Sequence, residues 1–196
     1  MTAFAGFAFV VLSAIAALLV GDVPGASSSA TEIADYFDDE HTRIVTSVYV
    51  QGLSLVFFVW FLAGLGWRLN SAGSPLRARI AYAAGLVATA LFAQAAVVFG
   101  ALAYRATDDA SVAQSLFDLA LFAQNTAAFP IAALVAVASP RWTGVLLAAV
   151  FLVDGLTFAG DGFWAPDGDY SRVAYLGFLA WATATSGRIL VGRSAA

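Results

Sequence analysis

Five polar side chains interrupt the long apolar stretches of this sequence: Gln51, Gln94, Asp118, Asn125 and Asp154. Carboxyl and amide groups can bind solutes or ions, and inside a bilayer they rarely occur without a partner. An ionised acid at the centre of a membrane costs about 2.5–3.5 kcal/mol on insertion scales, so Asp118 and Asp154 are expected to face a protein interior, a partner or water. The five residues are the candidates for lining a polar ligand cavity.

The spacing of these residues predicts polar stripes on helices. At 100° per residue, Gln114, Asp118 and Asn125 fall within roughly 40° of one another, whereas Gln124 falls on a different face. A second stripe, within about 60°, consists of Ser47, Gln51 and Ser54. Hydroxyl and amide groups often do no more than join neighbouring helices. The sequence therefore leaves open whether the stripes line a cavity or hold a bundle together.

Pro130 lies five residues beyond Asn125, inside the same apolar stretch. A proline in a helix interior removes a backbone hydrogen bond and clashes with a preceding carbonyl group, so a kink is expected here. Kinks of this kind contribute to transport in some membrane proteins and are merely tolerated in many bundles.

The composition indicates the elements that must position these residues. The 196 residues are 61% hydrophobic and 11% charged, far from the roughly 25% charged residues of a soluble domain. We therefore predict an all-α fold, a single integral membrane domain over residues 1–196 built as a six-transmembrane helical bundle. The expected spans are residues 3–20, 44–67, 78–104, 112–138, 142–160 and 173–191. The first is interpreted as a retained span, because no basic residue precedes it as in a signal peptide.

A polar, acidic segment separates the first two spans. Ser29 and Glu32 have the spacing of a capping box, and Ile33, Tyr36 and Phe37 follow the spacing of one helical face. We expect a short extracytoplasmic amphipathic helix at the membrane interface. The candidates for a partner interface on it are Glu32, Tyr36, Phe37, Asp38 and Asp39.

The arginines predict an orientation. With up-and-down helices, six arginines lie on the side of the termini, namely Arg68, Arg77, Arg79, Arg141, Arg188 and Arg193. Three lie on the other side, namely Arg43, Arg105 and Arg172. The positive-inside rule then places both termini in the cytoplasm.

Several kinds of chemistry have no support in the sequence. There is no cysteine, so thiolate chemistry and disulfides are excluded, and no nucleotide-binding or zinc-protease motif occurs. His41 beside acidic residues could sense pH or bind a metal, and Asp161, Asp167 and Asp169 could bind a hard cation, but the sequence favours a solvated loop for both groups. We predict no cofactor, no metal and no catalytic residue.

Three groups of short motifs carry a resemblance. They are the segment at residues 30–37 with its "E-I-x-x-Y" pattern, residues 49–53 with the aromatic run 57–62, and residues 129–132 with the Pro-Arg-Trp turn at 140–142. In this order they resemble a family of bacterial multi-pass integral membrane proteins without an assigned activity, over most of the chain. The resemblance implies six helices in a bacterial cytoplasmic membrane and assigns no catalytic residue.

These observations favour a non-enzymatic binding or accessory subunit of a membrane complex, whose acidic outer segment meets a partner. The alternative is a small-solute or ion transporter that uses an outward-facing polar cavity, and a lipid-acting membrane enzyme is the third possibility. The expected partners are membrane lipids and either a membrane protein or further copies of the chain. Nucleic acid is not expected, because nothing in the sequence makes a basic patch.

Overall fold

The computed structural model describes residues 1–105, 109–157, 165 and 168–191, and all regular structure in them is helical. The all-α prediction is thereby confirmed for this part of the chain. The helices are α1 (Thr2–Val20), α2 (Ala30–Asp39), α3 (His41–Ser71), α4 (Pro75–Arg105), α5 (Ala110–Thr126), α6 (Ala128–Ala138), α7 (Arg141–Asp154) and α8 (Asp169–Val191).

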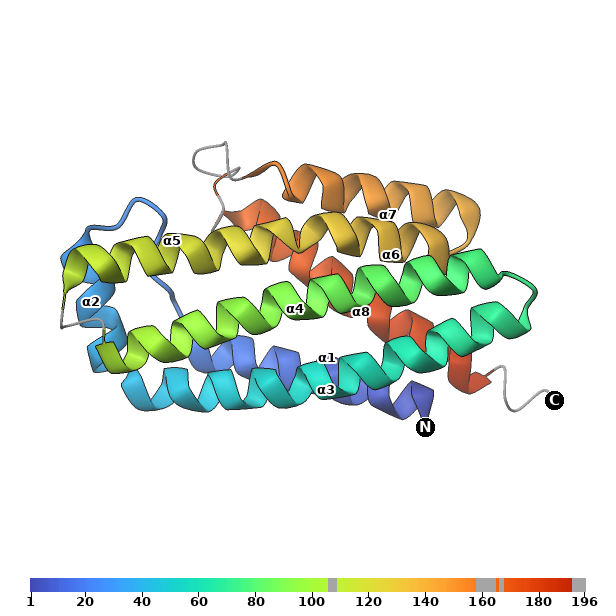
Figure 1. Ribbon diagram of the computed structural model, residues 1–196, viewed down its shortest axis with the longest axis horizontal. Coiled ribbons are helices and arrows are strands. Elements are labelled where there is room, and N and C mark those ends of the chain that lie inside the picture. Colours follow the sequence, from blue (N-terminus) through green and yellow to red (C-terminus); the bar gives the residue numbers. More distant parts are fainter. Residues whose placement is uncertain (106–108, 158–164, 166–167, 192–196) are drawn as a thin grey trace.

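The long helices run up and down and form a closed ring (Figure 1). α1 packs between α3 and α8, α4 packs between α3 and the α5–α6 pair, and α7 joins α6 to α8. The start of α1 and the end of α8 lie at the same end of the molecule (Figure 1). α2 lies at the opposite end, which we call the α2 end.

Four helical segments are long and apolar enough to cross a membrane: α1, α3, α4 and the continuous stretch Ala110–Ala138 made of α5 and α6. A multi-pass membrane protein is therefore indicated. α7 has 14 residues, which is short for a span, and α8 has the length but is less apolar because of Arg188 and its Thr and Ser residues.

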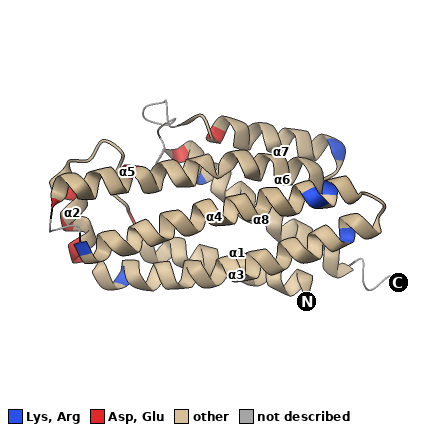
Figure 2. Cartoon of the chain, in the orientation of Figure 1, with Lys and Arg blue, Asp and Glu red and all other residues tan. Residues whose placement is uncertain are grey.

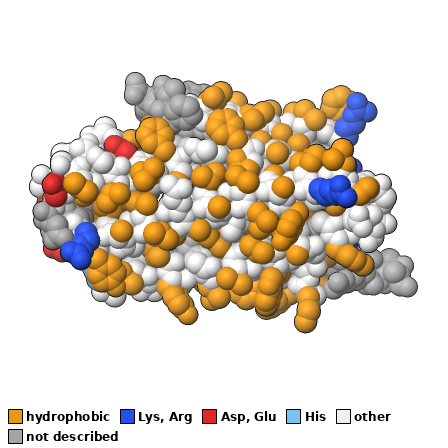
Figure 3. All heavy atoms as spheres, viewed as in Figure 1, with side chains coloured by type: hydrophobic (Ala, Val, Ile, Leu, Met, Phe, Trp, Pro, Cys, Tyr) orange, Lys and Arg blue, Asp and Glu red, His pale blue; other side chains and the backbone are white. Residues whose placement is uncertain are grey.

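Apolar side chains cover the flank of the bundle between its two ends (Figure 3). Large apolar side chains, such as those of Trp60, Val97 and Leu146, remain exposed. An apolar surface of this extent would be a liability in water, whereas lipid solvates it.

The predicted distortion at Pro130 is confirmed as an interruption between α5 and α6. α5 ends at Thr126, Ala127 forms a turn, and α6 begins at Ala128. Thr126 is four residues before Pro130. The proline has no N–H that could bond to the Thr126 carbonyl group, and its ring crowds that group. The Ala127 N–H bonds to the carbonyl groups of Ala123 and Gln124, so the chain continues in the same direction.

Side chains from neighbouring helices satisfy the carbonyl groups at helix C-termini, which have no partner within their own helix. At the α2 end, the Tyr36 hydroxyl donates to the Val20 oxygen of α1 at 2.7 Å, and His41 Nδ1 donates to the Ala103 oxygen of α4 at 2.6 Å. At the opposite end of the molecule, where α1 starts and α8 ends, the Arg68 side chain donates to the Ile189 main-chain oxygen of α8 at 3.2 Å. These contacts fix the ends of the ring.

α2 closes one end of the bundle through its apolar face. Ile33 and Phe37 are buried, and the Phe37 ring makes edge-on contacts with Phe99 of α4 and Phe117 of α5, at centroid distances of 5.3 and 6.1 Å. The predicted capping box is present, with the Glu32 N–H bonded to the Ser29 hydroxyl and the Ser29 N–H to the Glu32 carboxylate. The predicted short amphipathic helix is thus confirmed.

Candidate ligand cavity

A cavity of about 350 Å³ occupies the centre of the ring, in the half toward the α2 end. Helices α1, α3, α4, α5, α6, α7 and α8 all contribute to its wall, together with the loop after α1. Most of the wall is apolar. The polar side chains that line it are Ser47, Gln51, Gln124, Asn125, Asp154, Ser171, Arg172 and Tyr175.

Asp154 is the last residue of α7 and is 9% exposed. Its Oδ1 is buried without a hydrogen-bond partner, while the Ser171 hydroxyl of α8 bonds to the carboxyl group. The main-chain oxygen of Asp154 accepts a bond from the Thr157 hydroxyl at 2.7 Å. One carboxylate oxygen is therefore left to accept a hydrogen bond inside the cavity.

Asn125 lies in the last turn of α5, directly before the interruption at Ala127, and is 6% exposed. Its Nδ2 atom is also buried and without a partner. A buried polar group without a hydrogen bond costs about 1–3 kcal/mol, so such groups are uncommon in native proteins. The wall of this cavity contains two such groups, a donor on Asn125 and an acceptor on Asp154. A bound polar molecule or an ordered water could form the missing hydrogen bonds.

The five sequence candidates divide into two groups. Gln51, Asn125 and Asp154 line the cavity, and the structure brings them together from α3, α5 and α7. Gln94 and Asp118 are not among the lining residues: Gln94 is exposed on the flank of α4, and Asp118 is half-buried in the middle of α5. The sequence interpretation also missed Gln124, which lines the cavity beside Asn125 although it was assigned to another face.

The serines of the second stripe join helices. The Ser47 hydroxyl donates to the Ala16 oxygen of α1 at 2.7 Å, and the Ser13 hydroxyl of α1 donates to the Ser54 oxygen at 3.2 Å. Of the two interpretations left open for the stripe, helix joining therefore describes Ser54, and Ser47 both joins helices and lines the cavity.

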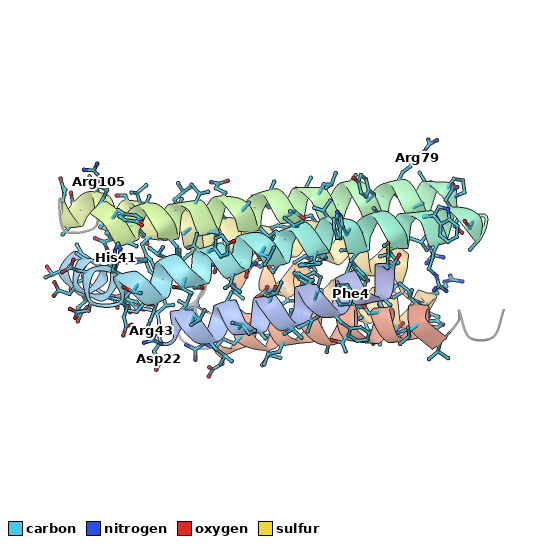
Figure 4. All side chains as sticks on the ribbon, turned by 90° about the horizontal axis from the view of Figure 1, so that it is seen from below. Phe4, Asp22, His41, Arg43, Arg79 and Arg105 are labelled. Carbon is cyan, nitrogen blue, oxygen red and sulfur yellow. The ribbon has the colours of Figure 1, made fainter. Side chains whose placement is uncertain are left out.

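The cavity reaches the α2 end of the molecule. Gly21 and Pro24 from the loop after α1 contribute to its wall there, as does Arg172 at the start of α8. Arg172 is largely exposed and pairs with Asp169 at 3.5 Å, so it does not neutralise Asp154. Acidic residues gather in the half of the molecule toward the α2 end, whereas the charged residues that are described at the opposite end are arginines (Figure 2). Asp22, His41, Arg43 and Arg105 lie at the α2 end, and Arg79 lies far from them (Figure 4).

The candidates for a partner interface on α2 also divide into two groups. Glu32, Asp38 and Asp39 are exposed, but Phe37 is fully buried and belongs to the core, because its side chain fills the space between α4 and α5. Tyr36 is half-buried, and burial raises its pKa to about 12, so its hydroxyl remains protonated and available to donate to Val20. Bonds from the Ser29 N–H and hydroxyl lower the pKa of Glu32 below its ordinary value.

His41 contacts Tyr104 and the Ala103 carbonyl group rather than the cavity. Within the described residues, no group of three or more His, Asp or Glu side chains could hold a metal ion. Of the three acids considered for a hard cation, Asp169 pairs with Arg172, and Asp161 and Asp167 lie outside the described residues.

No family model, curated protein or solved structure matches this chain. The membrane assignment therefore rests on the chain itself, and the resemblance to a bacterial family stays a prediction.

Proposed function

We propose that this chain is a non-enzymatic binding protein of a bacterial cytoplasmic membrane, which holds a small molecule in the cavity between its helices. The observation that carries this function is the pair of buried, unpaired polar atoms, Asn125 Nδ2 and Asp154 Oδ1, in one cavity wall. Ligand sites are typically mostly apolar with a few convergent polar groups and volumes of about 300–1,000 Å³. The cavity has this composition and a volume of about 350 Å³.

Six crossings, with both termini in the cytoplasm, belong to this proposal. The closed ring supports six crossings, because α7 and α8 pack side by side with the four long segments and complete the ring between α6 and α1. The arginines support the orientation, because Arg68, Arg77 and Arg141 lie at the end of the termini, where no described acidic residue is found. The cavity would then open toward the outside.

An accessory role in a membrane complex extends the same function. The acids of α2 that face away from the bundle form a small negative surface at the mouth end, consisting of Glu32, Asp35, Asp38 and Asp39. A membrane-protein partner with a basic outer segment, or another copy of the chain, would contact this surface.

The test compares purified wild-type protein with the variants Asn125→Leu and Asp154→Leu, which remove the unpaired atoms and keep a similar side-chain volume. Mass spectrometry of small molecules extracted from the purified proteins is expected to find a species that the wild type retains and both variants lack. Both variants are also expected to keep or gain thermal stability, since leucine has no polar group to leave unpaired. Asp118→Leu is the matched control, and it should retain the species.

Equal retention of every small molecule by wild type and both leucine variants would contradict the proposal. In that case the cavity is a packing defect filled by water or lipid.

A transporter is the second candidate, and the interruption at Ala127 favours it. The helix break lies next to Asn125, so the cavity is lined by an interrupted membrane helix, as in many transporters. Reconstituted vesicles test this: uptake of the retained molecule should be measurable and should fall in Pro130→Ala, in which α5 and α6 can fuse. Binding without any uptake would leave the chain a binding protein only.

A further inference from the structure

The cavity contains a buried carboxyl group that no charged side chain among the described residues neutralises. Asp154 is nine-tenths buried, and no described arginine or histidine forms an ion pair with it. The arginine that lines the same cavity, Arg172, is engaged at the surface with Asp169. A buried carboxylate is stable only when a positive charge or several hydrogen bonds compensate it. A cationic group on a ligand would supply that charge.

Aromatic side chains lie close to the carboxyl group along both helices that hold it. Phe151 is one turn before Asp154 on α7, and Tyr175 is one turn after Ser171 on α8, and both line the cavity together with Phe178. Aromatic faces attract ammonium groups, especially where water is excluded. The apolar wall would also solvate the hydrocarbon part of a ligand.

The charge of the half of the molecule into which the cavity opens has the same sign. Acidic residues gather in that half (Figure 2), although the charged side chain that lines the mouth among the described residues is that of Arg172, which pairs with Asp169. A surplus of negative charge with low-dielectric walls concentrates cations and repels anions. Asn125 adds a different requirement, because its Nδ2 hydrogen atoms need an acceptor on the ligand.

We propose that the cavity binds a small organic ammonium ion with an apolar or aromatic body and one oxygen acceptor. The ammonium group pairs with Asp154, the oxygen accepts from Asn125, and the body packs among Phe151, Tyr175 and Phe178. This inference rests on the proposed ligand-binding function and adds the chemical class of the ligand.

The test uses three molecules of nearly the same shape that differ in charge: 2-amino-1-phenylethanol as the ammonium ion, 1-phenyl-1,2-ethanediol as the neutral analogue, and mandelate as the anion. Binding to the purified full-length protein is measured at pH 7 by calorimetry. The ammonium ion is expected to bind at least about tenfold more tightly than the diol, since a charged hydrogen bond is roughly twice as strong as a neutral one. Mandelate is expected not to bind.

Variants assign the contacts. Asp154→Asn should reduce the affinity for the ammonium ion to that of the diol, and Asn125→Leu should weaken all binding by about two- to tenfold, the value of one neutral hydrogen bond. Asp118→Asn, an acid outside the cavity on α5, should bind all three molecules as the wild type does.

Three outcomes would overturn the inference: diol binding as tight as ammonium binding, preference for mandelate, or no binding of any of the three. The wild-type selectivity needs no variant, so a failure of Asp154→Asn to fold does not remove the test. If the wild type nevertheless retains a neutral or anionic molecule that the leucine variants lack, ligand binding stands and only the ammonium class is wrong.

Discussion

Arg77 binds Ser139 across the end of the bundle: its Nη2 atom donates to the main-chain oxygen of Ser139 at 3.1 Å, and its Nε donates to that of Val137 at 2.7 Å. Arg77 belongs to the first turn of α4, and the two carbonyl groups belong to the last turn of α6 and its cap. One side chain thus satisfies carbonyl groups that α6 cannot satisfy itself and places a positive charge at the negative end of its dipole.

Removing this contact should destabilise the bundle. Arg77→Ala is expected to lower the free energy of unfolding by about 1–3 kcal/mol, the range for hydrogen bonds to charged groups. The measurement is thermal or denaturant unfolding in detergent. Arg79→Ala is the matched control, because Arg79 is exposed two residues along the same helix and points away from the bundle (Figure 4), and it should leave the stability unchanged. Similar losses for both variants would show that charge at this end matters rather than the contact.

Gly144 allows α7 to lie directly against α6. A Cβ atom at this position would stand 2.7 Å from the main-chain oxygen of Ala136, which belongs to rigid helix backbone. Gly144→Ala is therefore expected to destabilise the protein by about 1–3 kcal/mol, as overpacking does. Gly177→Ala on α8 has open space around the new methyl group and should be neutral or stabilising in the same unfolding assay. A neutral Gly144→Ala would mean that the α6–α7 pair is looser than described.

Phe37 anchors α2 to the bundle, and its loss should release that helix. Phe37→Ala is expected to cost about 3–5 kcal/mol, the usual range for a buried phenylalanine. Hydrogen exchange should then show faster exchange in α2 than elsewhere, because the contacts with Phe99 and Phe117 are lost. Phe4→Ala serves as the control, since Phe4 is 68% exposed on α1. Unchanged protection of α2 in Phe37→Ala would show that Ile33 suffices to hold it.

The capping box predicts a pH dependence of α2. The Ser29 bonds hold the pKa of Glu32 below its ordinary value of 4.5 in the folded state, so the ionised group favours the folded helix. This contribution is present above pH 4.5 and is lost as the pH falls through the lowered pKa. The protection of amides at the start of α2, measured relative to their intrinsic exchange rate, should therefore decrease in that window, and Glu32→Gln should remove the decrease. Asp35→Asn, which changes an exposed acid outside the capping box, should retain it.

Much of the fold follows from short-range patterns in the sequence. The spacing of Ser29 and Glu32 predicts the start of α2, the positions of Ile33 and Phe37 predict its buried face, and Pro130 predicts the interruption one turn before it. Each of these features depends on residues within a few positions of one another. Hydrophobic length predicts six spans, and four of them correspond to the helical segments of the structure that are long and apolar enough to cross a membrane. The short α7 and the less apolar α8 do not meet that criterion.

Which residues line the cavity depends on how the helices pack. The periodicity of the sequence gives only the direction in which a side chain points from the axis of its own helix. Asp118 and Asn125 share a stripe, yet they are almost two turns apart, and only Asn125 lines the cavity. Gln94 lies off the line of buried residues on α4, in which Ala81, Ala88 and Ala95 recur every seven residues. Gln124 sits between Leu121 and Ala128 at helical spacing, which is the signal that would have included it.

The contacts between α1 and α8 also set an order of assembly. The Tyr175 hydroxyl donates to the Ser13 main-chain oxygen, and Phe178 packs on Phe9, so the packing of α1 is completed by a helix that is synthesised much later. Until α8 emerges, the face of α1 that carries Phe9 and Ser13 must remain against lipid or the insertion machinery, and contacts so distant in sequence form slowly. The ring, and with it the cavity, comes into existence only after α8 has been made, so a chain shortened before α8 would lack one wall of the cavity.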